Sequence, residues 1–379
     1  MPVPKLLRDL LSLPTASFAE DLVLERVRET CRALPGVTCR EDRYGNLLAR
    51  YRYRPRKVTP LVFTAHTDHP GFVAQEMRDK RTLRAAFRGY VESPYFAGAR
   101  VCFWTANRWV RGRVVELTKE VTVHRGGRCV SRPEEVLIRV TEPVVAGAPG
   151  VWDLPAPRLQ GNLIHARGHD DIAGVAALLT LLARLSRRRA SADVFCLFTR
   201  AEEVGFIGAV GAMKARTVPK KLPVIVIETS KALPDARIGD GPILRVGDRL
   251  SVYAPELLAY MERVAQKLTK RRKTFAFQRK LMDGGACEAT GFMAYGYRAG
   301  GICLPLGNYH NMDTDRGRIA PECISLADWQ RLTDLFEALV TEEQDCGAPD
   351  RTVQADLEQR FNTHAALLAG CAPARRRRK

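Results

Sequence analysis

Hydrophobic residues recur along this chain with two different spacings, one typical of helices and one typical of strands. Residues 5–33 have the spacing of a helix, and "VTCREDRYGNLLARYRY" has the alternation and the turn of a β-hairpin. The apolar run "TPLVFTAH" predicts a short strand buried on both faces. From residue 170 onward, helical and strand patterns take turns, which is typical of a mainly parallel sheet flanked by helices. The sequence therefore predicts an α/β fold.

The second half of the chain supplies most of the expected elements. The expected helices are "DIAGVAALLTLLARLSRRR", "VGFIGAVGAMKA", "APELLAYMERVAQKLTKR", "CEATGFMAYG" and "SLADWQRLTDLFEALVTEEQ". The expected strands are "ADVFCLFT", "LPVIVIE" and "AGGICLPL".

The stretch from about 72 to 160 has a different texture. Short alternating segments follow one another, separated by Gly, Pro and charged turns, and no helix of any length fits among them. These segments are "TLRAAFRGYV", "ARVCFWT", "WVRGRVVELT", "EVTVHRG" and "EVLIRVTE". The pattern predicts a small all-β barrel or sandwich inserted into the α/β fold. We expect a discontinuous catalytic domain at 1–71 and 161–345, an inserted β domain at 72–160, and a C-terminal basic tail at 346–379 whose basic end is loose.

The net charge of +18 comes largely from basic runs at 184–189, at 267–273 and at the C-terminal end. Such charge fits a nucleic-acid or anionic-surface contact, and it equally fits a solvated surface in an arginine-rich protein. No nucleic-acid motif accompanies it, and no basic run is interleaved with aromatic residues. We therefore expect no nucleic-acid partner.

Three further features of the sequence indicate the cellular compartment. No apolar stretch has the length of a membrane span, and the N-terminus lacks the apolar core of a secretory signal. The ten cysteines are scattered without a CxxC pair, which favours reduced thiols over a disulfide framework. We expect a cytoplasmic protein without membrane contact.

Acidic and histidine residues gather where predicted strands end or helices begin. They are His66 and Asp68 in "FTAHTDHPG", Asp170 and Asp171 in "RGHDDIAGV", Glu202 and Glu203 in "FTRAEEVGFIGA", Glu228 in "PVIVIETS", and His310 in "LPLGNYHNM". Because ligands of open α/β sheets bind outside the carboxyl ends of the strands, the fold can bring these segments together.

Nitrogen and carboxylate donors without thiolate suit zinc, cobalt or manganese in a catalytic site. We expect Asp170 to bridge two metals, with His66 and Glu228 completing one site. Glu203 and His310 would complete the other site.

Two carboxylates remain for other roles. Glu202 would act as general base on the water that the metals activate. Asp68 would orient the imidazole of His66, as carboxylates beside metal-binding histidines do. Asp171 would shape the local backbone, while His69 and His169 have no clear coordination role.

Each motif alone has an ordinary explanation. "DDIAG" is most often a helix N-terminus, "EE" a solvated pair, and "HTD" or a lone histidine a surface loop. Their joint placement at strand ends is what favours a metal site, together with Gly174 after the aspartates and Gly205 after the glutamates.

This ordered set resembles the glutamyl and deblocking aminopeptidase family of two-metal metallopeptidases. The shared pattern is "HTD", an inserted β domain, "DDIAG", "EEVG", a strand-end acid and a late histidine, with echoes in "EDRYGNLLA" and "GDGPILRVGDR". The resemblance covers about residues 5–340. It implies a zinc-exopeptidase-like fold, a bridging Asp170, Glu202 as base, and often a cis peptide bond after Asp170. It also implies self-association through the β domain.

Several positions depart from the family pattern. Glu228 stands where an aspartate is usual, His69 replaces an acid, and Ile172 replaces a common arginine. Asn308 stands where arginine is frequent, and Cys287 with Glu288 where Thr-Asp is frequent. These positions concern metal affinity and substrate recognition.

The function predicted from the sequence is a dinuclear-metal aminopeptidase that acts on peptides. A first alternative is an amidohydrolase, deacylase or carboxypeptidase-like hydrolase of small N-acyl compounds. A second, non-enzymatic alternative is a basic protein that associates with nucleic acid.

Overall fold

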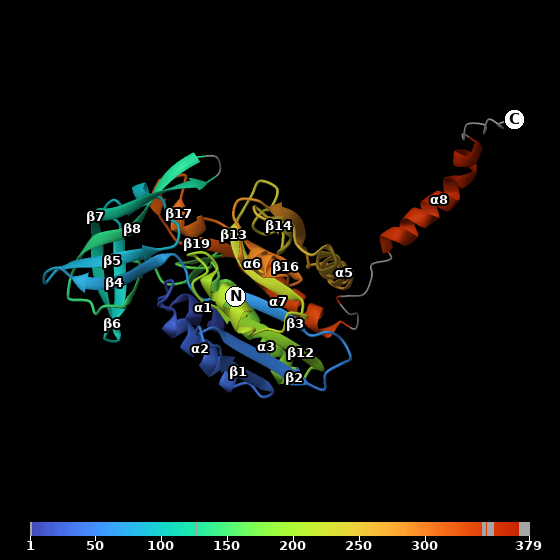
Figure 1. Ribbon diagram of the computed structural model, residues 1–379, viewed down its shortest axis with the longest axis horizontal. Coiled ribbons are helices and arrows are strands. Elements are labelled where there is room, and N and C mark those ends of the chain that lie inside the picture. Colours follow the sequence, from blue (N-terminus) through green and yellow to red (C-terminus); the bar gives the residue numbers. More distant parts are fainter. Residues whose placement is uncertain (1, 126–127, 343–345, 347–351, 371–379) are drawn as a thin grey trace.

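The computed structural model describes residues 2–125, 128–342, 346 and 352–370. A β-barrel lies on one side of an α/β body, and one helix projects from the other side (Figure 1). The helices are α1 (Lys5–Leu11), α2 (Asp21–Arg32), α3 (Ile172–Arg188), α4 (Ile207–Ala215), α5 (Pro255–Arg271), α6 (Glu288–Ala294), α7 (Leu326–Thr341) and α8 (Thr352–Gly370), with 3-10 turns η1 (Ser93–Phe96) and η2 (Tyr309–Asn311).

The α/β body is built on an eight-stranded mixed sheet in the order β1-β2-β12-β3-β13-β16-β14-β15. The four central strands, β12, β3, β13 and β16, run parallel to one another. Antiparallel pairs join β1 to β2, β2 to β12 and β14 to β16. The strands are β1 (Val37–Glu41), β2 (Leu47–Tyr53), β12 (Ala192–Thr199), β3 (Leu61–His66), β13 (Val224–Lys231), β16 (Ala299–Leu306), β14 (Ile243–Asp248) and β15 (Gln278–Met282).

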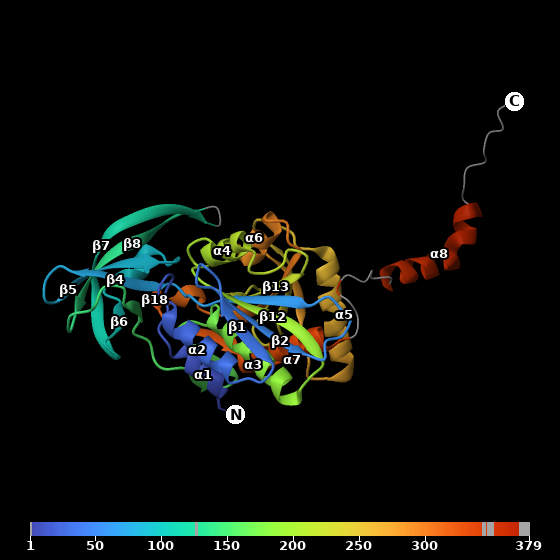
Figure 2. The same ribbon diagram turned by 60° about the horizontal axis from the view of Figure 1, so that its bottom comes forward.

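Helices cover both faces of this sheet (Figure 2). Apolar residues of α1, α2, α3 and α7 form the larger core on one face, and α4 and α6 form a second core on the other. Every residue of β3 is buried, as expected for a parallel strand covered on both sides. The hairpin of β1 and β2 and the buried strand at "TPLVFTAH" confirm two predictions from the sequence.

The barrel closes in the order β4-β5-β8-β7-β6-β9. Its interior holds a cluster of aromatic rings in mutual contact, all buried: Phe72, Phe87, Phe96, Phe103 and Trp152. The strands are β4 (Gly71–Met77), β5 (Thr82–Arg88), β8 (Arg128–Val140), β7 (Arg108–Arg125), β6 (Arg100–Thr105) and β9 (Pro149–Trp152). Closure pairs each of these strands with a neighbour on both sides over part of its length, while the outer parts of β7 and β8 pair only with each other.

Two small sheets lie between the barrel and the body. β11 (Leu163–Ala166) is flanked by β10 (Arg158–Gln160) and β19 (Glu322–Ser325), and β17 (Met312–Asp313) pairs with β18 (Arg318–Ile319). The late segments that carry β19 and η2 therefore return to the junction where the barrel leaves the body.

Several predicted elements are corrected. "WVRGRVVELT" and "EVTVHRG" form the single strand β7, whose shifts of register against β8 absorb the irregular alternation. Residues 5–33 contain two helices, α1 and α2, and between them Phe18 adopts a left-handed conformation (φ 70°). β14 and β15, which the sequence did not predict, widen the sheet and make its edge mixed.

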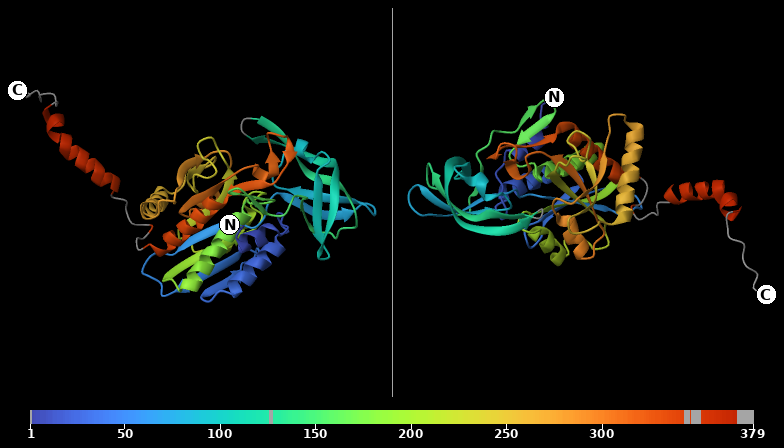
Figure 3. Two further views of the ribbon diagram at one scale, coloured as in Figure 1. Left: turned by 180° about the vertical axis from the view of Figure 1, so that it is seen from behind. Right: turned by 90° about the horizontal axis from the view of Figure 1, so that it is seen from above.

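The C-terminal segment contains one further helix. Thr352–Gly370 form α8, which the sequence did not predict, and the helix extends away from the body in every view (Figure 3). Exposed Leu357 and Phe361 show that local helix-forming residues, not packing, account for it. The basic end at 371–379 lies outside the described residues. In the described part of the chain, no helix is long and apolar enough to cross a membrane.

The two internal basic runs face acidic residues of α7. Arg184 of the first run lies 2.8 Å from Asp334, and Arg272 of the second lies 2.6 Å from the same carboxylate. Lys267 pairs with Glu342, just past α7, at 3.1 Å. Exposed pairs of this kind contribute little stability, but they neutralise part of the charge that the sequence concentrates there.

Candidate metal centre

His66 ends β3 and presents its Nε2 atom to two carboxylates. Nε2 lies 3.4 Å from Oδ1 of Asp170 and 3.5 Å from Oε1 of Glu228. Its Nδ1 atom donates a hydrogen bond to the backbone oxygen of Asp68, 3.1 Å away. A histidine that donates from Nδ1 can offer the lone pair of Nε2 to a metal. His66, Asp170 and Glu228 therefore form a first possible ligand set.

His310 repeats this arrangement on the other side of Asp170. Its Nε2 atom lies 3.5 Å from Oδ2 of Asp170 and 3.4 Å from Oε1 of Glu203. Its Nδ1 atom donates to the backbone oxygen of Tyr90 across 2.6 Å. These three side chains form a second possible ligand set. Each oxygen of Asp170 thus faces a different histidine, as a carboxylate between two metals would.

The parallel centre of the sheet brings these segments together. His66 pairs with Thr199 in register, so β3 and β12 end side by side, and Glu202 lies three residues after Thr199. Asp170 lies just before α3, and His310 lies in η2 after β16. Glu228 lies inside β13 instead of at its end, because that strand continues to Lys231. The rule that ligands gather at the carboxyl ends of parallel strands therefore describes His66, Glu202 and His310, whereas Glu228 lies within its strand.

Asp68 anchors the two neighbouring glutamates as well as His66. Its buried carboxylate accepts the backbone N–H of Glu202 at 3.0 Å and that of Glu203 at 3.2 Å. Oδ1 also lies 3.4 Å from Nδ1 of His66, and Ser17 donates to Oδ2 at 2.6 Å. Burial raises the pKa of Asp68, but contact with His66 and hydrogen bonds from Ser17 and the backbone of Glu202 together lower that pKa below its usual range. Asp68 thus joins the segment after β12 to the segment after β3.

Asp171 and Gly174 shape the turn into α3. The peptide bond between Asp170 and Asp171 is cis, as the resemblance implied. Thr229 donates to Oδ1 of Asp171 at 2.9 Å, which ties this turn to β13. A Cβ atom on Gly174 would lie 2.3 Å from Oδ2 of Asp171, so any larger residue would have to displace that carboxylate. The glycine of "DDIAG" is therefore explained by contact with the second aspartate.

Glu202 lies among the same carboxylates. Its side chain is 7% exposed and, with His66 and Glu203, forms a third group that could hold an ion. Burial and then repulsion from Glu228 raise the pKa of Glu202 well above its usual range. Burial and then repulsion from Asp170 likewise raise the pKa of Glu228, to about 7. The site concentrates more negative charge than its two histidines offset.

The donor atoms fit divalent metals. Oδ1 of Asp170 and Oε1 of Glu203 are buried and accept no hydrogen bond from the described residues. Each faces a histidine Nε2 across 3.4 Å, which is longer than a good hydrogen bond. Buried carboxylate oxygens are stable only when they are paired, so a cation between these atoms would complete them. The oxygen and nitrogen donors match zinc, cobalt or manganese.

Neither of the two extra histidines joins the ligand sets. Nδ1 of His69 donates to the backbone oxygen of Asp170 at 2.6 Å, and Nε2 lies 3.1 Å from Oδ1 of Asn311. Nε2 of His169 donates to the backbone oxygen of Ile164 at 2.9 Å. Both imidazoles therefore support the backbone around Asp170, and sequence reasoning gave them no other role.

Sequence reasoning missed three buried residues beside the site. Glu322 accepts backbone hydrogen bonds from both ligand segments around Asp170 and His310. Glu288, which was noted only as a departure from the family, accepts from Thr64 at 3.0 Å, and burial raises its pKa to about 7. Arg245 is 2% exposed in β14. No local pattern marks Glu322, because it acquires its surroundings only through long-range packing. Arg245 lies in "GDGPILRVGDR", a segment that resembles the family, but sequence reasoning assigned that arginine no role.

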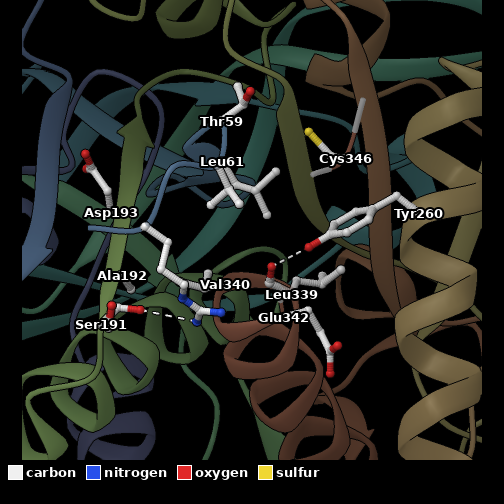
Figure 4. Close-up of a pocket in the computed structure, with 12 residues that line it drawn as sticks. Thr59, Leu61, Ser191, Ala192, Asp193, Tyr260, Leu339, Val340, Glu342 and Cys346 are labelled. Carbon is white, nitrogen blue, oxygen red and sulfur yellow. Dashed lines mark hydrogen bonds between the residues drawn. The ribbon is translucent and has the colours of Figure 1, made fainter. Parts of the chain in front are cut away.

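A small cavity at the opposite end of the sheet is not part of this site. It has a volume of about 20 Å³, space for about one water molecule, and Figure 4 shows its lining. Leu61 and Ala192, the first residues of β3 and β12, line it, whereas the ligand sets lie where these strands end. Nearby, Tyr260 donates from its hydroxyl to the backbone oxygen of Leu339 at 2.6 Å. Nothing in this cavity combines acidic and histidine donors.

Comparison with known families gives one clear match. The model of the M42 glutamyl aminopeptidase family matches residues 45–315. A relative from Acetivibrio thermocellus that carries a provisional aminopeptidase name is 25% identical over 308 residues, which are 77% of this chain and 85% of that protein.

Solved structures confirm the fold. The aminopeptidase APDkam598 of the archaeon Desulfurococcus kamchatkensis superposes with a TM-score of 0.72 at 23% identity, covering 89% of this chain and 94% of that chain. The TET1 peptidase of Pyrococcus horikoshii, which can assemble into a tetrahedron or a large octahedral shell, superposes with a TM-score of 0.72 at 21% identity. The match covers 89% of this chain and 99% of the TET1 chain.

Proposed function

We propose that this chain, which belongs to the M42 glutamyl aminopeptidase family and is a metal-dependent aminopeptidase, has its active site around Asp170. There it would remove N-terminal residues from peptides. The placement of Asp170 carries this proposal. Its two oxygens lie 3.4 Å and 3.5 Å from Nε2 of His66 and His310, in two ligand sets that share no other residue. A site for two ions follows from that sharing.

The residues divide into two metal-binding groups around the shared aspartate. His66 and Glu228 would hold one ion with Asp170, and Glu203 and His310 would hold the other. Two bound divalent ions lower the pKa of a water molecule and polarise the scissile carbonyl. Zinc or cobalt suits the donors best, and manganese is a further choice.

Glu202 would move the proton in this reaction. It is the acid of the cluster that neither pair of ligands around Asp170 requires, and Asp68 fixes its backbone N–H at 3.0 Å. Its carboxylate would accept a proton from the attacking water and return it to the leaving amine. Asp68 would not contact the substrate itself. It would position both Glu202 and the ring of His66.

Arg245 suggests which N-terminal residue the site prefers. Its Nη1 atom donates to Oγ of Ser230 at 3.4 Å, and its Nε atom has no hydrogen-bond partner among the described residues. Ser230 lies two residues after Glu228 in β13, so both side chains face the same side of the sheet. A buried guanidinium without a carboxylate partner is costly, and an acidic substrate side chain would pair with it. We propose a preference for N-terminal glutamate or aspartate.

The barrel is proposed to be a separate inserted domain that mediates self-association. Its aromatic core is distinct from the two cores of the α/β body, which supports an independent unit. The TET1 peptidase of Pyrococcus horikoshii forms closed shells, and a homo-oligomer of this chain would follow the same principle. Light scattering should give a mass several times that of one chain. A monomer at all concentrations would contradict this part of the proposal.

Two measurements test the function. Elemental analysis of the reconstituted protein should find two equivalents of a transition metal, and a chelator should abolish activity that zinc or cobalt then restores. A panel of free and N-blocked peptides separates the aminopeptidase from a deacylase: only peptides with a free N-terminus should be cleaved. Cleavage restricted to blocked substrates would overturn the proposed reaction, while absence of metal would overturn the site.

A further inference from the structure

Glu322 is a buried carboxylate that the proposed chemistry does not use. It begins β19, it is 0% exposed, and it pairs with Ala166 of β11 in register. Its Oε2 atom accepts the backbone N–H of His169 at 2.6 Å and that of Asp170 at 3.3 Å. Its Oε1 atom accepts the backbone N–H of His310 at 2.9 Å. One carboxylate thus holds two ligand segments that are far apart in the sequence.

The backbone around His310 needs such support. Asn308, His310 and Asn311 have φ values of 54°, 54° and 65°, in the left-handed region that residues other than glycine rarely adopt. Strained backbone of this kind persists only where the surrounding structure fixes it. Glu322 supplies one fixed point through the backbone of His310, and Tyr90 supplies another through the imidazole.

We propose that Glu322 is a positioning residue that sets the separation between Asp170 and His310 and so holds the second metal of the proposed two-metal site. A carboxylate is suited to this task because both of its oxygens accept hydrogen bonds and neither donates. The inference rests on the proposed two-metal site and extends it to a residue that contacts neither ion.

The Glu322→Gln variant tests the inference in the full-length chain. Glutamine keeps the shape but turns an amide NH₂ toward N–H groups, so at least one of the two segments loses its acceptor. Cobalt titration of the metal-free protein, followed by calorimetry and visible absorption, measures each equivalent separately. We expect one of the two equivalents to lose about 10- to 100-fold in affinity, as for other residues that support metal ligands.

Asp328 provides a matched control. It is also 0% exposed, and its carboxylate accepts the backbone N–H of Gly239 at 2.6 Å and that of Gly241 at 2.9 Å. None of its hydrogen-bond partners among the described residues belongs to either ligand set. Asp328→Asn should lower the thermal unfolding temperature like Glu322→Gln but leave both cobalt affinities unchanged. A purely structural role of Glu322 predicts the same affinities in both variants.

Three outcomes separate the claims. Wild-type cobalt affinities in Glu322→Gln would overturn the positioning role and leave the two-metal site intact. A wild-type chain that binds fewer than two equivalents would overturn that site and this inference with it. If Glu322→Gln does not fold, Glu322→Asp carries the test. It keeps the acceptors but shortens their reach, so unchanged affinity for both equivalents in that variant would overturn the inference.

Discussion

The Nδ1 atom of His310 donates a hydrogen bond to the backbone oxygen of Tyr90 across 2.6 Å. Tyr90 follows β5 of the barrel, whereas His310 follows β16 of the α/β body. Met312, two residues after His310, is buried in the aromatic core of the barrel. The barrel therefore fixes the orientation of one proposed metal ligand. A shift of the barrel relative to the α/β body would also move the imidazole of His310.

The shared carboxylate predicts a stepwise loss of metal. Asp170→Ala removes an oxygen donor from both ligand sets, so the purified variant should hold close to no metal. His310→Ala removes a donor from one set only and should retain about one equivalent, because His66, Asp170 and Glu228 remain. Elemental analysis of the two variants checks this difference. Equal metal content in both would contradict a bridging role for Asp170.

Two neighbouring glutamates should respond differently to the same change. Glu202→Gln should keep both metals and lower kcat by about 10²- to 10⁴-fold, the usual loss on removal of a general base. Glu203→Gln should instead weaken one metal, because Oε1 of Glu203 faces His310 across 3.4 Å. Metal analysis and steady-state kinetics on both variants separate the two roles. Near-normal turnover of Glu202→Gln would remove that residue from proton transfer.

Gly174→Ala should destabilise the protein although alanine is the better helix former. The new Cβ atom would lie 2.3 Å from Oδ2 of Asp171, whose carboxylate also accepts from Thr229. Overpacking of this kind costs about 1–3 kcal/mol. Gly291→Ala in α6 is the matched control, since its Cβ would meet no atom closer than 3.6 Å. That control should gain about 0.5–1 kcal/mol in the free energy of unfolding.

Chemical denaturation of both glycine variants measures these changes. Opposite signs are expected for two substitutions that are identical in chemistry and in secondary structure. A Gly174→Ala protein at least as stable as the wild type would show that Asp171 can move without cost.

Arg245 should govern preference for acidic N-terminal residues. Arg245→Met removes the charge and keeps much of the side-chain volume, so kcat/KM for a glutamyl substrate should fall relative to that for a leucyl substrate. The expected change in this ratio is about 10- to 100-fold, the range for loss of a hydrogen-bonded charged partner. Arg245→Lys should retain part of the preference. An unchanged ratio in Arg245→Met would place the specificity elsewhere.

Several parts of the site could be predicted because they follow from local order. The apolar run of β3 ends at His66, and the run of β12 ends just before Glu202. The sequence therefore places both residues at the carboxyl ends of neighbouring strands. Glu322 and Arg245 could not be found in this way. Their short strands carry no clear period, and each residue gains its importance from atoms that are distant in the sequence.

The sequence by itself determined the α/β pattern, the all-β segment and the order of acidic and histidine residues along the chain. These depend on hydrophobic periodicity and turn residues, which act over a few neighbouring positions. Only the tertiary structure decided that Asp170 turns one oxygen to His66 and the other to His310. It also decided that Tyr90 of the barrel holds the ring of His310, because hydrogen-bond geometry arises only when distant segments pack together.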